Sequence, residues 1–469
     1  MIRNQHAERR IKPIDDKLHV HAWTPKGFLL AGQLDLDEDG EQMSATFAYD
    51  GAYIETPGAY PLDPVNLPFG KTLYSTQSQF VRLGSIFDAA PDAWGRKVVS
   101  AQLPESAKQR VFRGAFLRGA DGIGSLVITP ASLAGELALD DIVQLSLTER
   151  PGLTQVARAA SAARDFEAGE DLSPEMANML GGSWTIGGAR PKSILRDDRS
   201  NAIAGLSFIA KFDSKHDKIN RNRLESASLS MAKDVGLNVK RHHLIDVQDG
   251  ISGGGSDKGT SGISGATALL LERFDRIVTH EQVHRLHYLS AMSLASHQPQ
   301  SKFLDSRLDQ AILSWSKLID LAGRISEHPA QAKAEMFARL CFNTALQNTD
   351  DHLKNFGFLK AQGSATRYEL APVFDVSPQA GSRHYLHLLD MGQTYTLEMA
   401  IANARRLGIS AAAASLVEDS IVQVVSQCGR YFDAAGLAMN DRAEAASWIG
   451  SGMGHKYAQT QKAARPRPA

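Results

Sequence analysis

The sequence predicts an α+β fold with a β-rich N-terminal part and a mainly helical C-terminal part. Between Leu18 and Pro68 short apolar runs alternate with turn residues, which is typical of a small antiparallel sheet. From His280 onward most apolar residues recur at three- and four-residue spacing, which is typical of packed helices. A chain of 469 residues is long enough for two or three domains or for one large protein of two lobes.

Composition and charge exclude several classes of function. A formal net charge of −1 argues against binding of nucleic acid or anionic membranes through bulk charge. The two cysteines, Cys341 and Cys428, lie far apart and predict neither a disulfide framework nor a zinc cluster. No apolar run approaches the length of a membrane span and the start of the chain lacks a signal-like apolar run, so we expect a cytoplasmic chain with no membrane partner.

The N-terminal elements follow from local pattern. We expect a helix that opens near Pro91, in which Trp94 packs as a structural anchor, and a helical, Ala-rich connection over 132–174. The expected strands are 27–34, 44–49, 52–54 and 125–128.

A glycine-rich segment, 181–195, follows this connection. Gly187 and Gly188 would let backbone amides approach phosphate oxygens, although the segment fits a plain hairpin turn equally well. The next strand, 206–212, carries Lys211 near its end, where protein kinases place the lysine that pairs with the α- and β-phosphates of ATP.

An amphipathic helix over 222–236 comes next, with Gly236 as its C-cap. Glu225 in its first turn is a candidate ion-pair partner for Lys211. The alternative, a charge that complements the helix dipole, is favoured when the residue is considered by itself. A Gly/Ser-rich insertion, 249–265, is expected to form a surface loop.

The strand 266–271 leads into the charged run 272–276. At this place a kinase has its hinge, and an acid just beyond the hinge can bond a ribose, which makes Asp275 a candidate. The alternative is an exposed charge cluster at the end of a strand.

The most polar stretch in an apolar setting is 347–358, which follows a predicted buried helix over 335–346. Asp350 and Asn355 are five residues apart, as are the catalytic aspartate and the magnesium-binding asparagine of protein kinases, whereas Asp351 gives a spacing of four. Asp375 ends an apolar run some twenty residues later and is the candidate second metal ligand.

Another reading of this stretch pairs His352 with Asp351 as metal ligands of a hydrolase. No second His/Asp pair at ligand spacing supports it. We therefore favour the phosphotransfer site.

Several of these motifs together resemble the HipA family of bacterial serine/threonine kinases. The resemblance spans roughly 18–437 and is carried by the motifs at 91–96, 188–192, 272–276, 348–356 and 371–375. It implies a bilobal protein-kinase-like fold that uses ATP and Mg²⁺. It also implies the toxin of a type II toxin–antitoxin module, whose best-known member phosphorylates glutamyl-tRNA synthetase and so arrests growth.

The resemblance also assigns site residues. Asp350 matches the catalytic base, and Asn355 and Asp375 match the magnesium ligands. Family members silence themselves by phosphorylating a serine before the glycine-rich loop, which matches Thr185 here, with Ser183 close by. The residues that match the nucleotide-binding motifs are Gly187, Gly188, Ala189, Lys192, Lys211, Glu272, Phe274, Asp275, His352 and Lys354.

The implied partners are a protein substrate, such as an aminoacyl-tRNA synthetase, and a HipB-like helix-turn-helix antitoxin through which DNA is contacted indirectly. The alternative from another class is an interaction protein that assists repression by a DNA-binding antitoxin. The predicted domains are a β-rich N-terminal subdomain over 18–131, an ATP-binding lobe over 132–276, a helical C-lobe over 277–455 and a disordered basic tail over 456–469.

Overall fold

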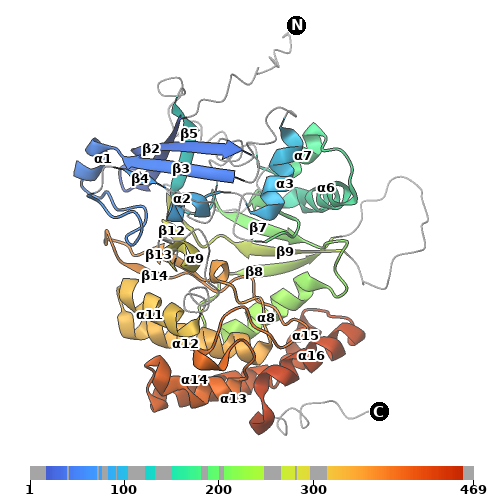
Figure 1. The fold of residues 1–469 in the computed structure, drawn as a ribbon. Coiled ribbons are helices and arrows are strands. Elements are labelled where there is room, and N and C mark those ends of the chain that lie inside the picture. The colour runs from blue at the N-terminus through green and yellow to red at the C-terminus, as the bar shows by residue number, and fades with distance from the viewer. Residues whose placement is uncertain are drawn as a thin grey trace, which may run out of the picture.

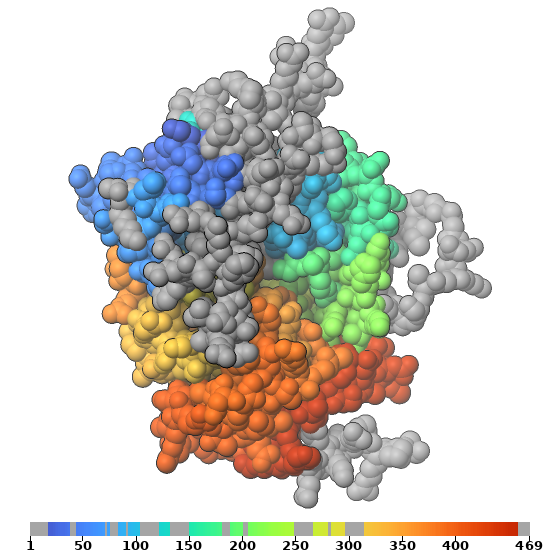
Figure 2. Space-filling view, in the orientation of Figure 1, coloured from blue at the N-terminus to red at the C-terminus, as the bar shows by residue number. Residues whose placement is uncertain are grey.

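The structure is a computed structural model. It describes residues 17–39, 42–70, 73–75, 83–90, 92–103, 122–131, 150–180, 188–199, 205–247, 266–279, 283–295 and 314–457. The N-terminal part, a second sheet with its helices, and a helical C-terminal part occupy adjoining regions of the molecule (Figures 1 and 2).

An antiparallel five-stranded sheet, in the order β4-β3-β2-β1-β5, forms the N-terminal subdomain (Figure 1). Burial alternates along β1, where Leu18, Val20 and Ala22 are fully buried, so one face of the sheet covers the subdomain's core. The strands are β1 (Lys17–Thr24), β2 (Gly27–Asp39), β3 (Gln42–Tyr49), β4 (Tyr74–Ser75) and β5 (Leu126–Pro130).

The strand expected at 52–54 is a short helix instead, α1 (Gly51–Glu55). The side chain of Asp50 accepts hydrogen bonds from the backbone amides of Ala52 and Tyr53. This N-cap starts a helical turn, and the prediction of a strand from β-branched and aromatic residues is therefore wrong.

A second antiparallel sheet, in the order β6-β7-β9-β8, holds Lys211 and the end of the glycine-rich segment from Lys192 onward. Along β7, Phe208, Ala210 and Phe212 belong to the core shared with three helices, whereas Ile209 and Lys211 face the cavity next to the fourth helix, α8. Alternation along the strand thus places Lys211 on the α8 side. The strands are β6 (Lys192–Arg196), β7 (Ser207–Phe212), β8 (His242–Asp246) and β9 (Thr267–Glu272), and the helices are α3 (Ala93–Gln102), α6 (Val156–Ala168), α7 (Pro174–Leu180) and α8 (Arg221–Val235).

The helix α3 shows how the first two predicted domains share a core. Trp94 in α3 is 2% exposed, and its indole Nε1 donates to the carbonyl of Lys192 in β6 at 3.0 Å. The expected anchoring of Trp94 is therefore present, but on the second sheet. The boundary near residue 131 stays a prediction.

The C-lobe is mainly helical and is built around α12, which packs against α11, α13, α14 and α16. Its core also takes in α8. The helices are α11 (Trp315–Ile325), α12 (Pro329–Leu346), α13 (Leu397–Ala402), α14 (Ala411–Val425), α15 (Cys428–Ala434) and α16 (Met439–Met453).

Short strands interrupt the region after residue 280, which the sequence predicts as helical. Two hairpin strands, β10 (Arg276–Val278) and β11 (Val283–Arg285), pair with each other. A three-stranded sheet pairs β12 (Tyr288–Ser290) with β13 (Gly357–Lys360), and β13 with β14 (Tyr368–Leu370). Strands of three or four residues carry too little alternation to be recognised locally.

Buried polar contacts fasten the N-terminal subdomain to this small sheet. Asp88 of α2 (Gly84–Asp88) accepts from the amide and the hydroxyl of Ser290 at 2.7 and 2.8 Å. The ring of His287 donates from Nε2 to the carbonyl of Leu62 at 2.8 Å, because a carbonyl oxygen can only accept. The subdomain therefore helps to fix β12, the neighbour of β13.

The ordered C-terminal part extends slightly beyond the predicted boundary. Lys456 lies in a 3₁₀ turn, His455–Tyr457, and its ammonium pairs with Glu418. Residues 458–469 lie outside the described residues. None of the helices in the described ranges has both the length and the apolar character that a membrane span requires.

Candidate active site

Lys211 is the centre of the site. Its ammonium contacts both carboxylate oxygens of Glu225 in α8, at 2.7 and 2.9 Å, and one oxygen of Asp375 at 2.8 Å. Lys211 is 8% exposed and Glu225 is 3% exposed. Buried charges of this kind are stable only when paired, so the three groups form one electrostatic unit.

The position of Glu225 decides between its two predicted roles. Helix α8 begins at Arg221 with Asn220 as N-cap, so Glu225 lies beyond the first turn, where the helix dipole acts most strongly. The ion pair with Lys211 is therefore its role in the fold, and the helix-dipole interpretation is wrong. Asn222 strengthens the arrangement, because its amide donates to the carbonyl of Lys211 at 3.2 Å.

The charges of this unit depend on one another. Burial opposes ionisation of Lys211, but the carboxylates of Asp375 and Glu225 raise its pKa above the ordinary value. Burial also works against ionisation of Asp375, yet Lys211 lowers the pKa of that carboxyl to about 2. Burial raises the pKa of Glu225. Lys211 lowers it and the charge of Asp375 raises it, and the net shift is upward.

Helix α12 delivers the polar loop that follows it. The helix ends at Leu346, and its C-cap is Gln347, a buried residue with a left-handed φ of 62°. Within the loop Asp351 is 1% exposed and Asp350 is exposed. Of the two aspartates, only Asp350 is therefore accessible to an acceptor hydroxyl, in agreement with the choice made from spacing.

Asp351 anchors the loop. Its Oδ1 accepts from the amides of Tyr385 and Leu386 at 2.7 and 3.3 Å, and its Oδ2 accepts from the indole of Trp315 at 3.2 Å. Tyr395 also donates to Oδ2, at 3.3 Å. With both oxygens occupied, Asp351 is poorly placed to pair with His352 as a metal ligand.

His352 lies beside the exposed carboxylate instead, with its Nε2 at 3.7 Å from Oδ1 of Asp350. Although the side chain of Asp350 is exposed, partial desolvation by the surrounding loop raises the pKa of its carboxyl. His352 opposes this rise, and the charges of Asp375 and Asp351 add to it. A carboxylate with a raised pKa is a stronger proton acceptor, which suits a general base.

Asn355 and Asp375 line one small cavity, as the predicted metal ligands should. The amide of Asn355 donates to the carbonyl of Asp350 at 2.8 Å, which turns its Oδ1 away. That Oδ1 is buried and has no hydrogen-bond partner in the described part of the chain. A carbonyl oxygen without a partner and a carboxylate form a donor set that suits Mg²⁺.

Asp375 has a φ of 54°, in the left-handed region that residues other than glycine seldom adopt. Such strain persists only where the surrounding structure enforces it. Here the contact with Lys211 supplies that constraint.

Three of the predicted nucleotide contacts share one cavity. Lys211, Glu272 and Phe274 line it together with Phe374, whose ring lies 5.5 Å from that of Phe274. The cavity joins the end of β9 to the lysine of β7, the relation expected of an adenine site and a phosphate site.

The family assignment follows from comparison with known sequences. The model of the HipA-like C-terminal domain family matches residues 184–432, which is more than half of the chain. The chain belongs to this family. The match includes Lys211, Asp350, Asn355 and Asp375, and no curated protein sequence matches the chain.

Two solved structures are similar to the chain to different degrees. HipA of the Shewanella oneidensis MR-1 toxin–antitoxin system, solved with HipB and operator DNA, is 15% identical with a TM-score of 0.57, covering 95% of this chain and 97% of that chain. The Helicobacter pylori proinflammatory kinase CtkA is 15% identical with a TM-score of 0.38, covering 58% of this chain and 94% of that chain. The match to HipA confirms the predicted HipA-like α+β fold.

Asp275, which we predicted to contact the ribose, is buried and held by other residues of the chain. It is 1% exposed, and its carboxylate is held by Arg273 and Arg276, each at 2.7 Å, and by the amide of Gly124 at 2.7 Å. Burial opposes the shift, but the two arginines lower the pKa of Asp275 well below its usual range. A ribose contact would disrupt this cluster, so Asp275 is a structural residue that joins the hinge to the N-terminal subdomain.

Lys192 is likewise occupied. It is 2% exposed, and its ammonium lies 2.6 Å from Asp92, the N-cap of α3. Gly188, with a left-handed φ of 102°, lies above this ammonium, and both Gly188 and Ala189 are exposed. Lys192 thus supports the glycine-rich segment, and a direct nucleotide contact stays a prediction.

Several predicted residues remain untested by the geometry. Thr185, Ser183 and Gly187, like the insertion 249–265, lie outside the described residues. Lys354 is half-buried, and its charge acts on the buried Asp88 of α2, where burial nevertheless raises the pKa of the carboxyl.

The structure adds Asn348 to the site. Its amide donates to Oδ1 of Asn343 at 2.5 Å, and it lines the cavity of Asn355 and Asp375. Its own Oδ1 is buried without a partner in the described ranges. The polar stretch 347–358 contains this residue, but spacing alone gives no reason to select it.

Proposed function

We propose that the chain is an ATP- and Mg²⁺-dependent serine/threonine protein kinase of the HipA type. The observation that carries the proposal is the unit of Lys211, Glu225 and Asp375. These residues come from a strand, a helix and the segment after β14, and they meet beside the exposed Asp350. A lysine fixed in this way can neutralise phosphate charge without moving during the reaction.

Each residue has a distinct task in the proposed reaction. Lys211 contacts the phosphates of ATP, and the amides beside Gly188 donate to their oxygens. Bound Mg²⁺ would supply charge neutralisation of the phosphates, with Asn355 Oδ1 and the Asp375 carboxylate as its protein ligands. Asp350 orients the acceptor hydroxyl and takes its proton while the hydroxyl oxygen bonds to the γ-phosphorus of ATP. The bond from the γ-phosphorus to the bridging oxygen of the β-phosphate breaks, and ADP leaves.

The decisive variant is Asp350→Ala. We expect the rate of phosphate transfer from Mg-ATP to fall roughly 10²- to 10⁴-fold, the usual weight of a positioned general base. The measurement is autophosphorylation and labelling of proteins in a bacterial lysate. Asp390→Ala, which alters an exposed acid paired with Arg406, is the matched control and should keep full activity.

No transfer by the wild-type chain in either assay would exclude the kinase proposal. Equal rates for wild type and Asp350→Ala would exclude Asp350 as the base. Mass spectrometry of the labelled chain also tests whether Thr185 or Ser183 is the autophosphorylated residue, as we propose from the family's self-silencing.

The proposed acceptor is a bacterial protein such as an aminoacyl-tRNA synthetase, whose phosphorylation would arrest growth. Phosphoproteomics after induced expression, with Asp350→Ala as comparison, identifies it directly. A site that gains phosphate only with the wild-type chain is the expected result.

A second function, binding of a HipB-like antitoxin and help in repression, is favoured by one comparison. The Shewanella HipA was solved with HipB and operator DNA, and it covers 95% of this chain. We expect a small helix-turn-helix protein to co-purify with this chain and to carry it onto DNA. Growth arrest that Asp350→Ala abolishes would assign the arrest to the kinase activity and not to this binding.

A further inference from the structure

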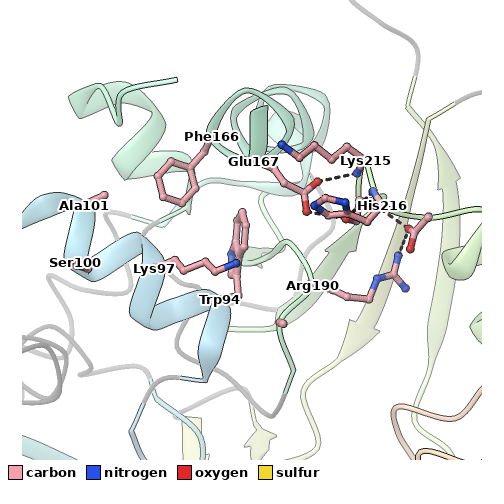
Figure 3. A pocket seen from close by; sticks show the side chains of 12 residues that line it. Trp94, Lys97, Ser100, Ala101, Phe166, Glu167, Arg190, Lys215 and His216 are labelled. Carbon is pink, nitrogen blue, oxygen red and sulfur yellow. Dashed lines mark hydrogen bonds and ion pairs between the residues drawn. The ribbon is translucent and has the colours of Figure 1, made fainter. Parts of the chain in front are cut away.

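A cavity of about 710 Å³ lies between α3, α6 and the loop that follows β7, beside the start of β6 (Figure 3). Trp94 from α3 and Phe166 from α6 form its apolar wall, with ring centroids 5.6 Å apart in an edge-to-face contact. Its volume falls within the range of sites that hold a ligand of several residues or of drug size. It therefore has room for more than one side chain.

The acids in the cavity wall are already occupied. Glu167 accepts from the hydroxyl of Ser214 at 2.6 Å and from the amide of Lys215 at 2.7 Å (Figure 3). Asp217 is paired with the guanidinium of Arg190 at 2.5 Å. The charge of Asp217 is therefore neutralised by Arg190, and the oxygens of Glu167 are taken by two neutral donors.

The two lysines in the wall have no ion-pair partner in the part of the chain that the structure describes. Lys97 and Lys215 are both exposed, and among the described residues neither ammonium has a carboxylate within ion-pair distance. The wall thus holds three cationic side chains, Lys97, Lys215 and Arg190, against the two carboxylates of Glu167 and Asp217. Its net charge is positive, so the cavity favours an anionic ligand.

The cavity adjoins the proposed active site. Arg190 follows Gly188 by two residues and forms part of the cavity wall. Arg221, at the start of α8, donates to the carbonyl of Pro378 at 3.0 Å. Burial lowers the pKa of Arg221 and Arg190 adds to this shift, whereas Asp217 and Asp350 oppose it. One cluster of charges thus runs from the cavity to the exposed Asp350.

We propose that this cavity binds an acidic segment of the acceptor protein and thereby sets which hydroxyl reaches Asp350. The proposal rests on the kinase function proposed above. Lys97 and Lys215 pair with Asp or Glu side chains near the acceptor residue, and the wall of Trp94 and Phe166 takes an apolar neighbour of those acids. The substrate class is therefore a serine or threonine flanked by acidic residues.

The test measures binding and transfer separately. The probes are two labelled nine-residue peptides with a central serine, one with four flanking glutamates and the other with four flanking lysines. Fluorescence anisotropy gives the Kd of each for the full chain. We expect the acidic peptide to bind at least about tenfold tighter, since two ion pairs are gained and like-charge contacts are avoided.

The charge-reversed double variant Lys97→Glu/Lys215→Glu should lose this preference or invert it. Lys218→Glu is the matched control, because Lys218 belongs to the same loop and is exposed but does not line the cavity. Autophosphorylation by both variants should stay within about twofold of wild type, since none of the three lysines contacts Lys211, Glu225 or Asp375.

Equal binding of the two peptides, or an acidic preference that survives the double reversal, would overturn the proposal. A chain that phosphorylates itself but shows no acidic preference refutes the cavity assignment alone. A chain that binds the acidic peptide through these lysines but transfers no phosphate to itself or to any protein refutes the kinase function and leaves the acidic site.

Discussion

Lys211 lies between two carboxylates that belong to different parts of the chain, Glu225 in α8 and Asp375 after β14. The distances to both are below 3 Å, so the position of each element depends on the other two. Asp350 and Asp351 are neighbours in sequence, but their side chains have different surroundings. One is exposed, and the other is enclosed by Trp315 and Tyr395.

The two aspartates should therefore respond differently to the same substitution. Asp351→Ala removes the acceptor of the buried Leu386 amide and the carboxylate that lies 3.3 Å from the buried ring of His384, and we expect a loss of about 1–3 kcal/mol in the free energy of unfolding. Asp350→Ala removes an exposed group and should change it by less than about 0.5 kcal/mol. Urea denaturation of both variants measures this, and similar midpoints would contradict the anchoring role of Asp351.

At the scale of elements, the position of the loop that carries Asp350 depends on how closely α12 is packed. Gly452 in α16 faces the end of α12, and a Cβ placed there would lie 2.2 Å from the carbonyl oxygen of Thr344. The last turn of α12 leads directly to Gln347 and the loop. A change in the α12–α16 distance is therefore expected to reach the site.

We expect Gly452→Ala to destabilise the protein by about 1–3 kcal/mol, the cost of overpacking, although alanine is the better helix former. Gly429→Ala in α15 is the matched control, because a Cβ there would have no neighbour within 4 Å. This control should be neutral or stabilise by up to about 1 kcal/mol. Equal unfolding midpoints for the two variants would show that α12 and α16 are less tightly packed than described.

At the scale of the whole molecule, the N-terminal subdomain is a structural support of the catalytic part. Asp88 and His287 lie at the boundary, and both act on β12, which pairs with β13 directly after the catalytic loop. The ring of His287 also contacts the hydroxyl of Ser125 at 2.8 Å. Burial disfavours the protonated form of the ring and lowers the pKa of His287 to about 4.

This histidine makes stability depend on pH in a defined direction. In the unfolded chain the imidazole takes up a proton near pH 6.5, whereas in the folded chain it does so only near pH 4. The free energy of unfolding should therefore fall as the pH drops between these values, by about 3 kcal/mol from this residue. Denaturation at a series of pH values measures the fall.

His287→Gln serves as the control, because an amide can donate to Leu62 and accept from Ser125 without titrating. The variant should show a flatter pH dependence than the wild type between pH 6.5 and pH 4. An unchanged slope would mean that other groups, such as the partly buried His21, produce the effect.

The candidate site residues that could be selected from the sequence are those whose spacing lies within one short stretch. The spacing of Asp350 and Asn355 is a local property of one loop, and the strand and helix that carry Lys211 and Glu225 are each evident from local pattern. The local sequence pattern could not show that Lys211 forms its ion pair with Glu225. That pairing depends on α8 crossing the same face of the sheet to which alternation turns Lys211.

By itself the sequence determined the HipA-like α+β class, the order of its main elements and the polar residues from which a phosphotransfer site can be built. Only the tertiary structure decided which of the motif's charged residues are free. Asp275 and Lys192 look as available in the sequence as Asp350. The partner of Lys192 is Asp92, 100 residues away, and Asp275 takes the amide of Gly124, 151 residues away, in addition to its neighbours Arg273 and Arg276. The burial of both residues depends on such distant contacts, and no local pattern encodes it.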